Sequence, residues 1–134
     1  MNTTERRRLR KLEKFLPTVI ESRFDMRHFS SERFSSPRLA KRHLRDCGTS
    51  ACALGWAGYL FPRLSAKAFE FKNLANDLFD IHSMTRDWDF LFSSSWARSD
   101  NSPAFAARRI NLYLEKGLPS RWHYSTPESE WEWS

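Results

Sequence analysis

The sequence predicts a mainly α fold, or an α+β fold with one small strand pair: a compact single domain of four to five helices around a central apolar helix near residues 50–61. Apolar residues recur at three- and four-residue steps in several segments, which is the spacing of amphipathic helices. The 134 residues include only 4 Gly and 6 Pro, too few for a turn-dense all-β protein. With 11 Phe and 6 Trp, the chain can bury one proper core.

The first predicted helix begins near Thr3 or Thr4, because either side chain can cap free backbone amides. Pro17 is expected to kink or restart this helix, since proline lacks an N–H and clashes with the preceding turn. Basic residues largely occupy the face opposite the apolar stripe. The stripe consists of Leu9, Leu12, Phe15, Leu16 and Val19 or Ile20.

Two stretches are less regular than the first helix. Residues 21–46 predict either a short strand around Phe24 or a short helix that ends near Leu44. Residues 65–80 predict one interrupted helix or two short ones, with a break near Lys72.

The most distinctive string is CGTSACALGW, residues 47–56. Gly48 can turn the chain, and Thr49 or Ser50 can cap a helix. From there to residue 61 the side chains are small or apolar on every side. A helix that is apolar all round belongs in the centre of a fold, so this segment is the predicted core helix, with Trp56 inside it.

The last third of the domain ends in a helix whose start and end are both marked by capping residues. Residues 88–92 predict a short helical or irregular piece, and residues 93–101 predict a polar loop that contains Trp96. A cap at Ser102 then starts the late helix, and Gly117 ends it.

Residues 118–134 form a tail outside the predicted globular domain, residues 1–117. The tail has no helical periodicity and carries acidic residues beside three tryptophans. Tryptophans exposed so close together are typical of interface hot spots. The competing interpretation is an ordered tail that folds back onto the basic N-terminal helix. The three tryptophans are Trp122, Trp131 and Trp133.

Charge is distributed unevenly along the chain. Residues 1–45 hold 13 of the 22 Lys and Arg and 5 of the 16 Asp and Glu, a net charge of +8, whereas residues 46–134 carry −2. This asymmetry indicates either an anionic partner or a solvated helix face. The net positive charge also excludes an inhibitor that mimics DNA, because such a protein must be strongly acidic. The basic side chains predicted to bind the partner are Arg6, Arg7, Arg8, Arg10, Lys11, Lys14, Arg38, Arg42 and Arg45.

Cys47 and Cys52 are the two cysteines of the chain, too few for a disulfide-stapled scaffold. A nucleophilic cysteine would need one of the four histidines of the chain as its general base. Residues 47–56, however, lack the Cys-Gly-Ser-Cys-Trp pattern of papain-like enzymes. A zinc site built on His43, Asp46 and the two cysteines lacks the second short ligand pair of structural zinc sites. We therefore expect packing roles, with no cofactor and no metal. The four histidines are His28, His43, His82 and His123.

The chain resembles a group of uncharacterised small bacteriophage and prophage proteins. The resemblance rests on Phe24-Asp25-Met26 and on a Cys-Gly-Thr-x-x-Cys-x-x-Gly-Trp core helix, and it covers roughly residues 10–117. It implies a phage accessory protein, a class that includes inhibitors of host defence, and it implies no activity. The motif residues are Cys47, Gly48, Thr49, Cys52, Gly55 and Trp56.

These observations predict a non-enzymatic phage-type accessory protein in the cytoplasm of a bacterial host. It would bind a host protein or nucleoprotein complex and inhibit a defence or regulatory complex. One alternative is a nucleic-acid-binding module that uses the basic N-terminal third; a second is a Cys- or metal-dependent enzyme. No apolar run reaches the roughly 20 residues of a membrane span, so no membrane partner is expected.

Overall fold

The computed structural model describes residues 1–27, 50–65 and 71–134, and these residues are mainly α-helical, as predicted. Several predicted binding and motif residues lie outside the described ranges: Arg38, Arg42, Arg45, Cys47, Gly48 and Thr49. Six α-helices occur in the described ranges: α1 (Thr3–Phe15), α3 (Ala53–Leu60), α4 (Pro62–Ser65), α5 (Phe71–Phe79), α6 (Arg86–Phe92) and α7 (Pro103–Lys116). Short 3-10 turns are η1 (Leu16–Thr18), η2 (Glu21–Arg23), η3 (Ser94–Arg98) and η4 (Glu128–Glu130).

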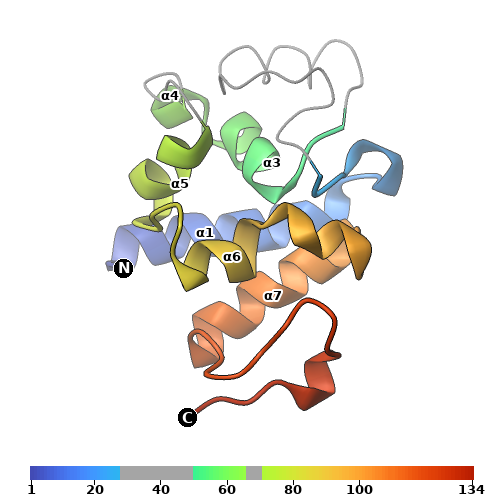
Figure 1. Ribbon diagram of the computed structural model, residues 1–134. Helices are drawn as coiled ribbons and strands as arrows, with labels where there is room; N and C mark the ends of the chain where they lie inside the picture. Colours follow the sequence, from blue (N-terminus) through green and yellow to red (C-terminus); the bar gives the residue numbers. More distant parts are fainter. Residues whose placement is uncertain (28–49, 66–70) are drawn as a thin grey trace.

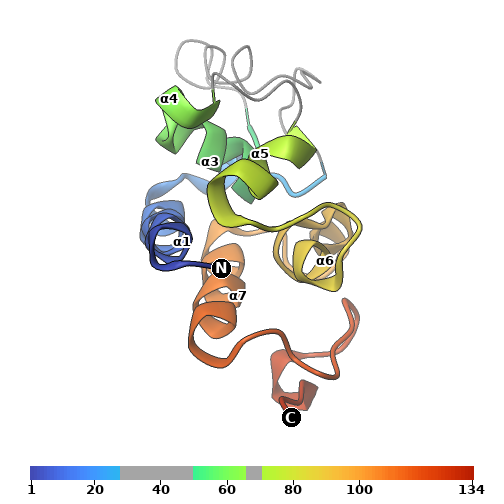
Figure 2. The same cartoon turned by 90° about the vertical axis from the view of Figure 1, so that its left-hand side faces the viewer.

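Helices α1 and α7 pack side by side through the middle of the molecule (Figure 1). Helices α3, α4 and α5 lie on one side of this pair, and residues 118–134 lie on the other. Viewed from the side, α7 sits between α1 and α6 (Figure 2). Among the described residues, β structure is limited to two isolated bridges, Phe24 with Ala51 and Arg121 with Glu132. Instead of the predicted strand around Phe24, the structure therefore has a single β-bridge at this residue.

Helix α1 begins at Thr3, as predicted, but its capping residue differs from the predicted one. Asn2, rather than Thr3 or Thr4, is the cap: its side chain accepts from the Glu5 amide at 2.8 Å, while the Glu5 carboxylate accepts from the Asn2 amide at 2.7 Å. This capping box satisfies two free amides at once. The helix ends before Pro17, which lies in η1, so the chain restarts there as one 3-10 turn.

Helix α3 is the central apolar helix, and every residue from Ala53 to Gly58 is buried. It is shorter than the predicted span because Cys52, not Ser50, caps it: the thiol sulfur lies 3.5 Å from the Gly55 amide, which donates to it. Thr49, the other predicted cap, lies outside the described residues. The Trp56 side chain is only 4% exposed, and its Nε1 donates to the Arg23 carbonyl at 3.0 Å.

The later elements are partly as predicted. Helix α7 has the expected Ser102 cap, and Gly117 ends it at φ 80, a left-handed conformation that glycine adopts without strain. Helix α5 is continuous from Phe71 through Lys72 to Phe79, while residues 66–70 of the segment predicted to be interrupted lie outside the described residues. The predicted polar loop contains η3, and Trp96 within it is fully buried.

Residues 118–134 are ordered and packed onto the domain. Trp131 is 6% exposed and belongs to the main core. Glu128 pairs with Arg108 of α7 at 2.8 Å rather than with the basic residues of α1. The tail thus folds back onto α7 instead of the N-terminal helix. In the part of the chain that the structure describes, no helix has the length and apolar character needed to span a bilayer.

Candidate partner-binding site

Three of the predicted binding residues line one hollow between α1 and α7, with a volume of about 330 Å³. Their spacing along α1 brings them to neighbouring turns of the same helix surface. The wall on the other side is Leu114 of α7. We call this hollow the basic groove; it is lined by Thr3, Arg6, Arg7, Arg10 and Leu114.

The three arginines of the basic groove differ in their contacts. Arg6 Nη2 donates to the Leu114 carbonyl at 2.6 Å. Arg10 Nη1 donates to the Asn111 amide oxygen at 2.7 Å and pairs with Glu13 at 2.5 Å. Arg7 is exposed, and among the described residues its guanidinium has no hydrogen-bond or ion-pair partner. Two guanidinium groups are therefore held in position while the third projects freely from the rim.

The other basic residues of α1 are divided between the fold and solvent. Arg8 Nη1 donates to the Leu78 and Asp77 carbonyls, at 3.1 and 3.3 Å, in the last turn of α5. Lys11 lies over the Phe61 ring, 5.6 Å from its centroid. Lys14 is exposed. The predicted basic face is thus split: Arg8 donates to α5, whereas Lys11 and Lys14 remain exposed.

Trp122 and Trp131 are built into an aromatic cluster rather than displayed together on the surface. The Trp131 ring centroid lies 5.8 Å from that of Trp96, and its Nε1 donates to the Thr126 carbonyl at 3.1 Å. Trp122 is half-buried and stacks on Trp96 at 5.6 Å. The expectation of exposed tryptophans is wrong for Trp131, because residues 118–134 cover an apolar face of the domain. The cluster comprises Phe90, Trp96, Phe105, Trp122, Tyr124 and Trp131.

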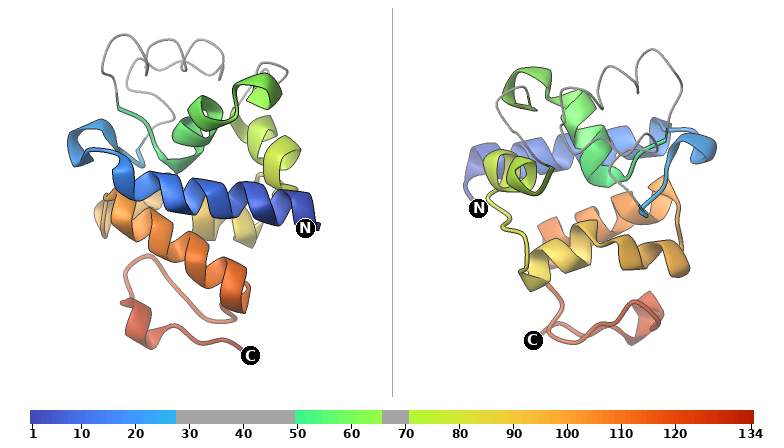
Figure 3. Two further views of the ribbon diagram at one scale, coloured as in Figure 1. Left: turned by 180° about the vertical axis from the view of Figure 1, so that it is seen from behind. Right: turned by 45° about the horizontal axis from the view of Figure 1, so that its top comes forward.

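Trp133 is half-buried and lies at the C-terminal end of α7. Its Nε1 donates to the Gly117 carbonyl at 2.9 Å, and the Lys116 ammonium sits 4.8 Å from the ring centroid. The start of α1 and the end of the chain both approach this end of α7 (Figure 3). The basic groove and Trp133 therefore flank the same helix terminus, whereas Trp131 does not share that surface.

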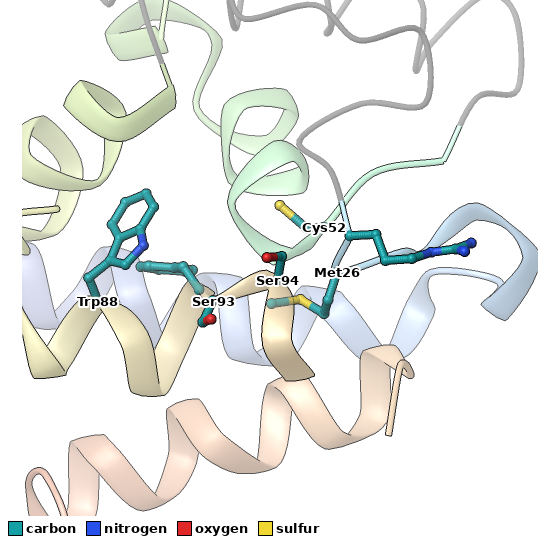
Figure 4. Close-up of a pocket in the computed structure, with 7 residues that line it drawn as sticks. Met26, Cys52, Trp88, Ser93 and Ser94 are labelled. Atoms are coloured by element: carbon teal, nitrogen blue, oxygen red, sulfur yellow. The ribbon is translucent and has the colours of Figure 1, made fainter. Parts of the chain in front are cut away.

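Cys52 lines a separate hollow of about 260 Å³, together with Met26, Trp88 and Ser93 (Figure 4). Its side chain is 2% exposed, and burial raises the pKa of the thiol to about 11. Because the thiolate is the nucleophile, a buried and protonated thiol is unreactive near neutral pH. The geometry of Cys52 is that of a helix cap and core residue.

Three of the four residues considered as a zinc site, His43, Asp46 and Cys47, lie outside the described ranges. Within residues 1–27, 50–65 and 71–134, no group of three His, Cys, Asp or Glu side chains is placed to hold a metal ion.

The Phe-Asp-Met element anchors the start of the chain to the α7 region. Asp25 is 7% exposed and accepts hydrogen bonds from the side chains of Arg27 and Asn101. The Asn101 amide oxygen in turn accepts from the Met26 amide at 2.6 Å. Each polar group in this small network has a partner, so the network has a structural role.

Arg109 is a buried cation that the sequence analysis missed. It is 0% exposed, and neither its Nε nor its two Nη atoms have a hydrogen-bond partner among the described residues. Its position, three residues after Ala106 and four before Tyr113, places it beside the apolar stripe of α7. That spacing is the signal that would have found it.

Comparisons of the chain with protein-family models, with curated protein sequences and with solved structures give no match in any of the three.

Proposed function

We propose that the chain is a non-enzymatic accessory protein of bacteriophage type that binds an acidic surface of a host protein through the basic groove, and so inhibits a host defence or regulatory complex. The observation that carries the proposal is the free Arg7 guanidinium at the rim of a hollow where Arg6 and Arg10 are already held in place. The phage origin and the inhibitory role are suggested by the resemblance of the core-helix motif.

Arginine suits a carboxylate partner because its planar donor fork matches the two carboxylate oxygens. Arg6 and Arg10 are held by Leu114 and Asn111, so they lose little side-chain freedom when a partner arrives. Arg7 is exposed and can swing onto the partner. Positive charge gathered at one groove also steers an acidic surface toward it.

A protein partner is favoured over nucleic acid by the short extent of the groove. Arg8 donates to carbonyls at the end of α5, so the basic groove itself presents only three arginines, which is short for a phosphate backbone. Trp96 and Trp131 are buried, which leaves them no face on which bases could stack. A nucleic-acid partner remains the alternative outcome of the test below.

The test is a quantitative pull-down from a nuclease-treated bacterial lysate with three tagged baits: wild type, Arg7→Gln and Arg63→Gln. Arg63 is an exposed arginine on α4, so Arg63→Gln is a charge-matched control outside the groove. We expect an acidic protein that wild type and the control retain and that Arg7→Gln loses. Equal capture by all three baits, or capture that is seen only in a parallel lysate without nuclease, would contradict an acidic protein partner at this groove.

A further inference from the structure

Arg109 is a buried cation without a hydrogen-bonding partner in the described part of the chain. All three of its side-chain nitrogens are inaccessible to solvent and without a hydrogen bond to the described residues. A buried charge is stabilised only when it is paired or hydrogen-bonded, so an unpaired guanidinium is an energetically strained feature of the core.

Aromatic rings provide the contacts that Arg109 does have. Its guanidinium carbon lies 4.5 Å from the Trp96 ring centroid and 5.0 Å from the Phe105 ring centroid. Cation–π attraction offsets part of the desolvation but leaves every N–H donor unused. Consistent with this, burial lowers the pKa of Arg109 to about 9.

The two rings that contact Arg109 also line a hollow of about 570 Å³. Tyr124 forms part of the wall, 4.8 Å from Trp96 between ring centroids. Asp100 lies on the same hollow and, with Tyr124, acts electrostatically on Arg109. We call this space the aromatic hollow; it is lined by Trp96, Arg98, Ser99, Asp100, Phe105, Tyr124 and residues 125–128.

We propose that the aromatic hollow binds a small ligand that carries an oxyanion, a carboxylate or a phosphate, which pairs with the guanidinium of Arg109. Such a group would accept the hydrogen bonds that Arg109 now lacks, in the bidentate geometry that arginine favours. The volume is in the range of small-molecule sites, and aromatic walls suit an apolar or planar ligand body.

The rings that form the walls differ in how deeply they are buried. Trp96 is held by hydrogen bonds from its Nε1 to the Asp89 and Phe90 carbonyls, at 3.1 and 2.9 Å. Phe105 and Tyr124 are only half-buried, and Arg109 is fully buried and is not one of the residues that line the hollow, so the proposal requires a ring to move before a ligand reaches the guanidinium. The ligand would therefore meet the fixed Trp96 ring together with the half-buried rings of Phe105 and Tyr124.

Two acidic side chains border the hollow, and they affect an anion differently. Glu128 is paired with Arg108, which neutralises it. Asp100 is exposed, and among the described residues its carboxylate has no hydrogen-bond or ion-pair partner. Asp100 is therefore the group that repels an incoming anion or competes with it for Arg109.

The experiment follows the side-chain Nε–Hε resonance of Arg109 by NMR, assigned through its nuclear Overhauser contacts to Trp96. Inorganic phosphate and acetate are the two probes, each titrated at constant ionic strength against chloride. We expect a saturable shift with at least one probe, and the preferred probe distinguishes a phosphate from a carboxylate ligand. No shift of this resonance with either probe, up to tens of millimolar, would overturn the proposal.

Three variants make the result specific to this hollow. Asp100→Asn should tighten probe binding several-fold, because a competing negative charge is removed. Arg109→Met should abolish the probe-dependent rise in melting temperature that ligand binding gives the wild type. Arg7→Gln should leave the shift intact, since the basic groove is a different site. If Asp100→Asn alone shifts the Arg109 resonance and neither probe does, Asp100 is its partner and the proposal is wrong.

Discussion

The guanidinium of Arg6 donates a hydrogen bond of 2.6 Å to the carbonyl oxygen of Leu114, in the last turn of α7. Two residues further along α1, Arg8 makes the same kind of contact with Leu78 at the end of α5. Carbonyls in the last turn of a helix lack intrahelical partners and carry partial negative charge. Part of the positive charge of residues 1–45 therefore serves the fold.

This division predicts different consequences for neighbouring arginines. Arg6→Gln and Arg8→Gln should each lower the free energy of unfolding by about 1 kcal/mol, because each removes a hydrogen bond to a helix terminus. Arg7→Gln should change it by no more than about 0.5 kcal/mol. Urea denaturation of the three variants measures the difference. Equal losses in all three would mean that the positive charge of α1 acts as a whole.

Trp56→Ala should lower the stability by about 3–5 kcal/mol, since a large buried side chain is lost and a cavity remains. The variant also loses the hydrogen bond to the Arg23 carbonyl. Ile20→Ala is the matched surface control, because Ile20 is 68% exposed and should tolerate the change. If Trp56→Ala melts with the wild type, α3 is not the centre of the core.

The tail should be necessary for folding. Truncation after Gly117 removes Trp131 and uncovers Trp96 and Phe90, so we expect loss of the cooperative thermal transition. Trp131→Ala alone should lower stability by about 3–5 kcal/mol. Trp133→Ala should lower it by much less, because that ring is half-buried at the edge of the domain. A truncated chain that still unfolds cooperatively would contradict this role.

The Cys52 thiol should make stability depend on alkaline pH. Its pKa is raised from 9.0 to about 11 by burial, so the folded state keeps a proton that the unfolded state loses. The resulting stabilisation is complete below pH 9 and is lost as the pH rises toward 11. Urea titrations between pH 8 and 11 should show a steeper decline in the Cys47→Ser variant than in Cys47→Ser/Cys52→Ala. Parallel declines would contradict the raised pKa.

Local signals account for the parts of the fold that could be predicted. Both ends of α7 could be predicted from the sequence, because Ser102 and Gly117 act on backbone groups close to them. The burial of α3 followed from a segment without polar side chains. The cap at Asn2 was missed because adjacent polar residues compete for the same role.

The parts that could not be predicted depend on contacts between distant segments. Trp131 is buried because the tail returns to the face formed by Phe90 and Trp96. Arg6 and Arg8 belong to the fold because α1 happens to run past the ends of two other helices. Charge counts along the chain cannot distinguish such arginines from Arg7, which has no partner among the described residues.

The most direct test of the account is the association rate of the captured partner, measured against sodium chloride concentration for wild type, Arg7→Gln and Arg63→Gln. Charge at an interface rim acts mainly on association and its salt dependence. We predict that Arg7→Gln associates more slowly and with a weaker salt dependence, while Arg63→Gln matches the wild type. Association of Arg7→Gln at the wild-type rate, with the same salt dependence, would contradict the claim that the basic groove binds an acidic partner.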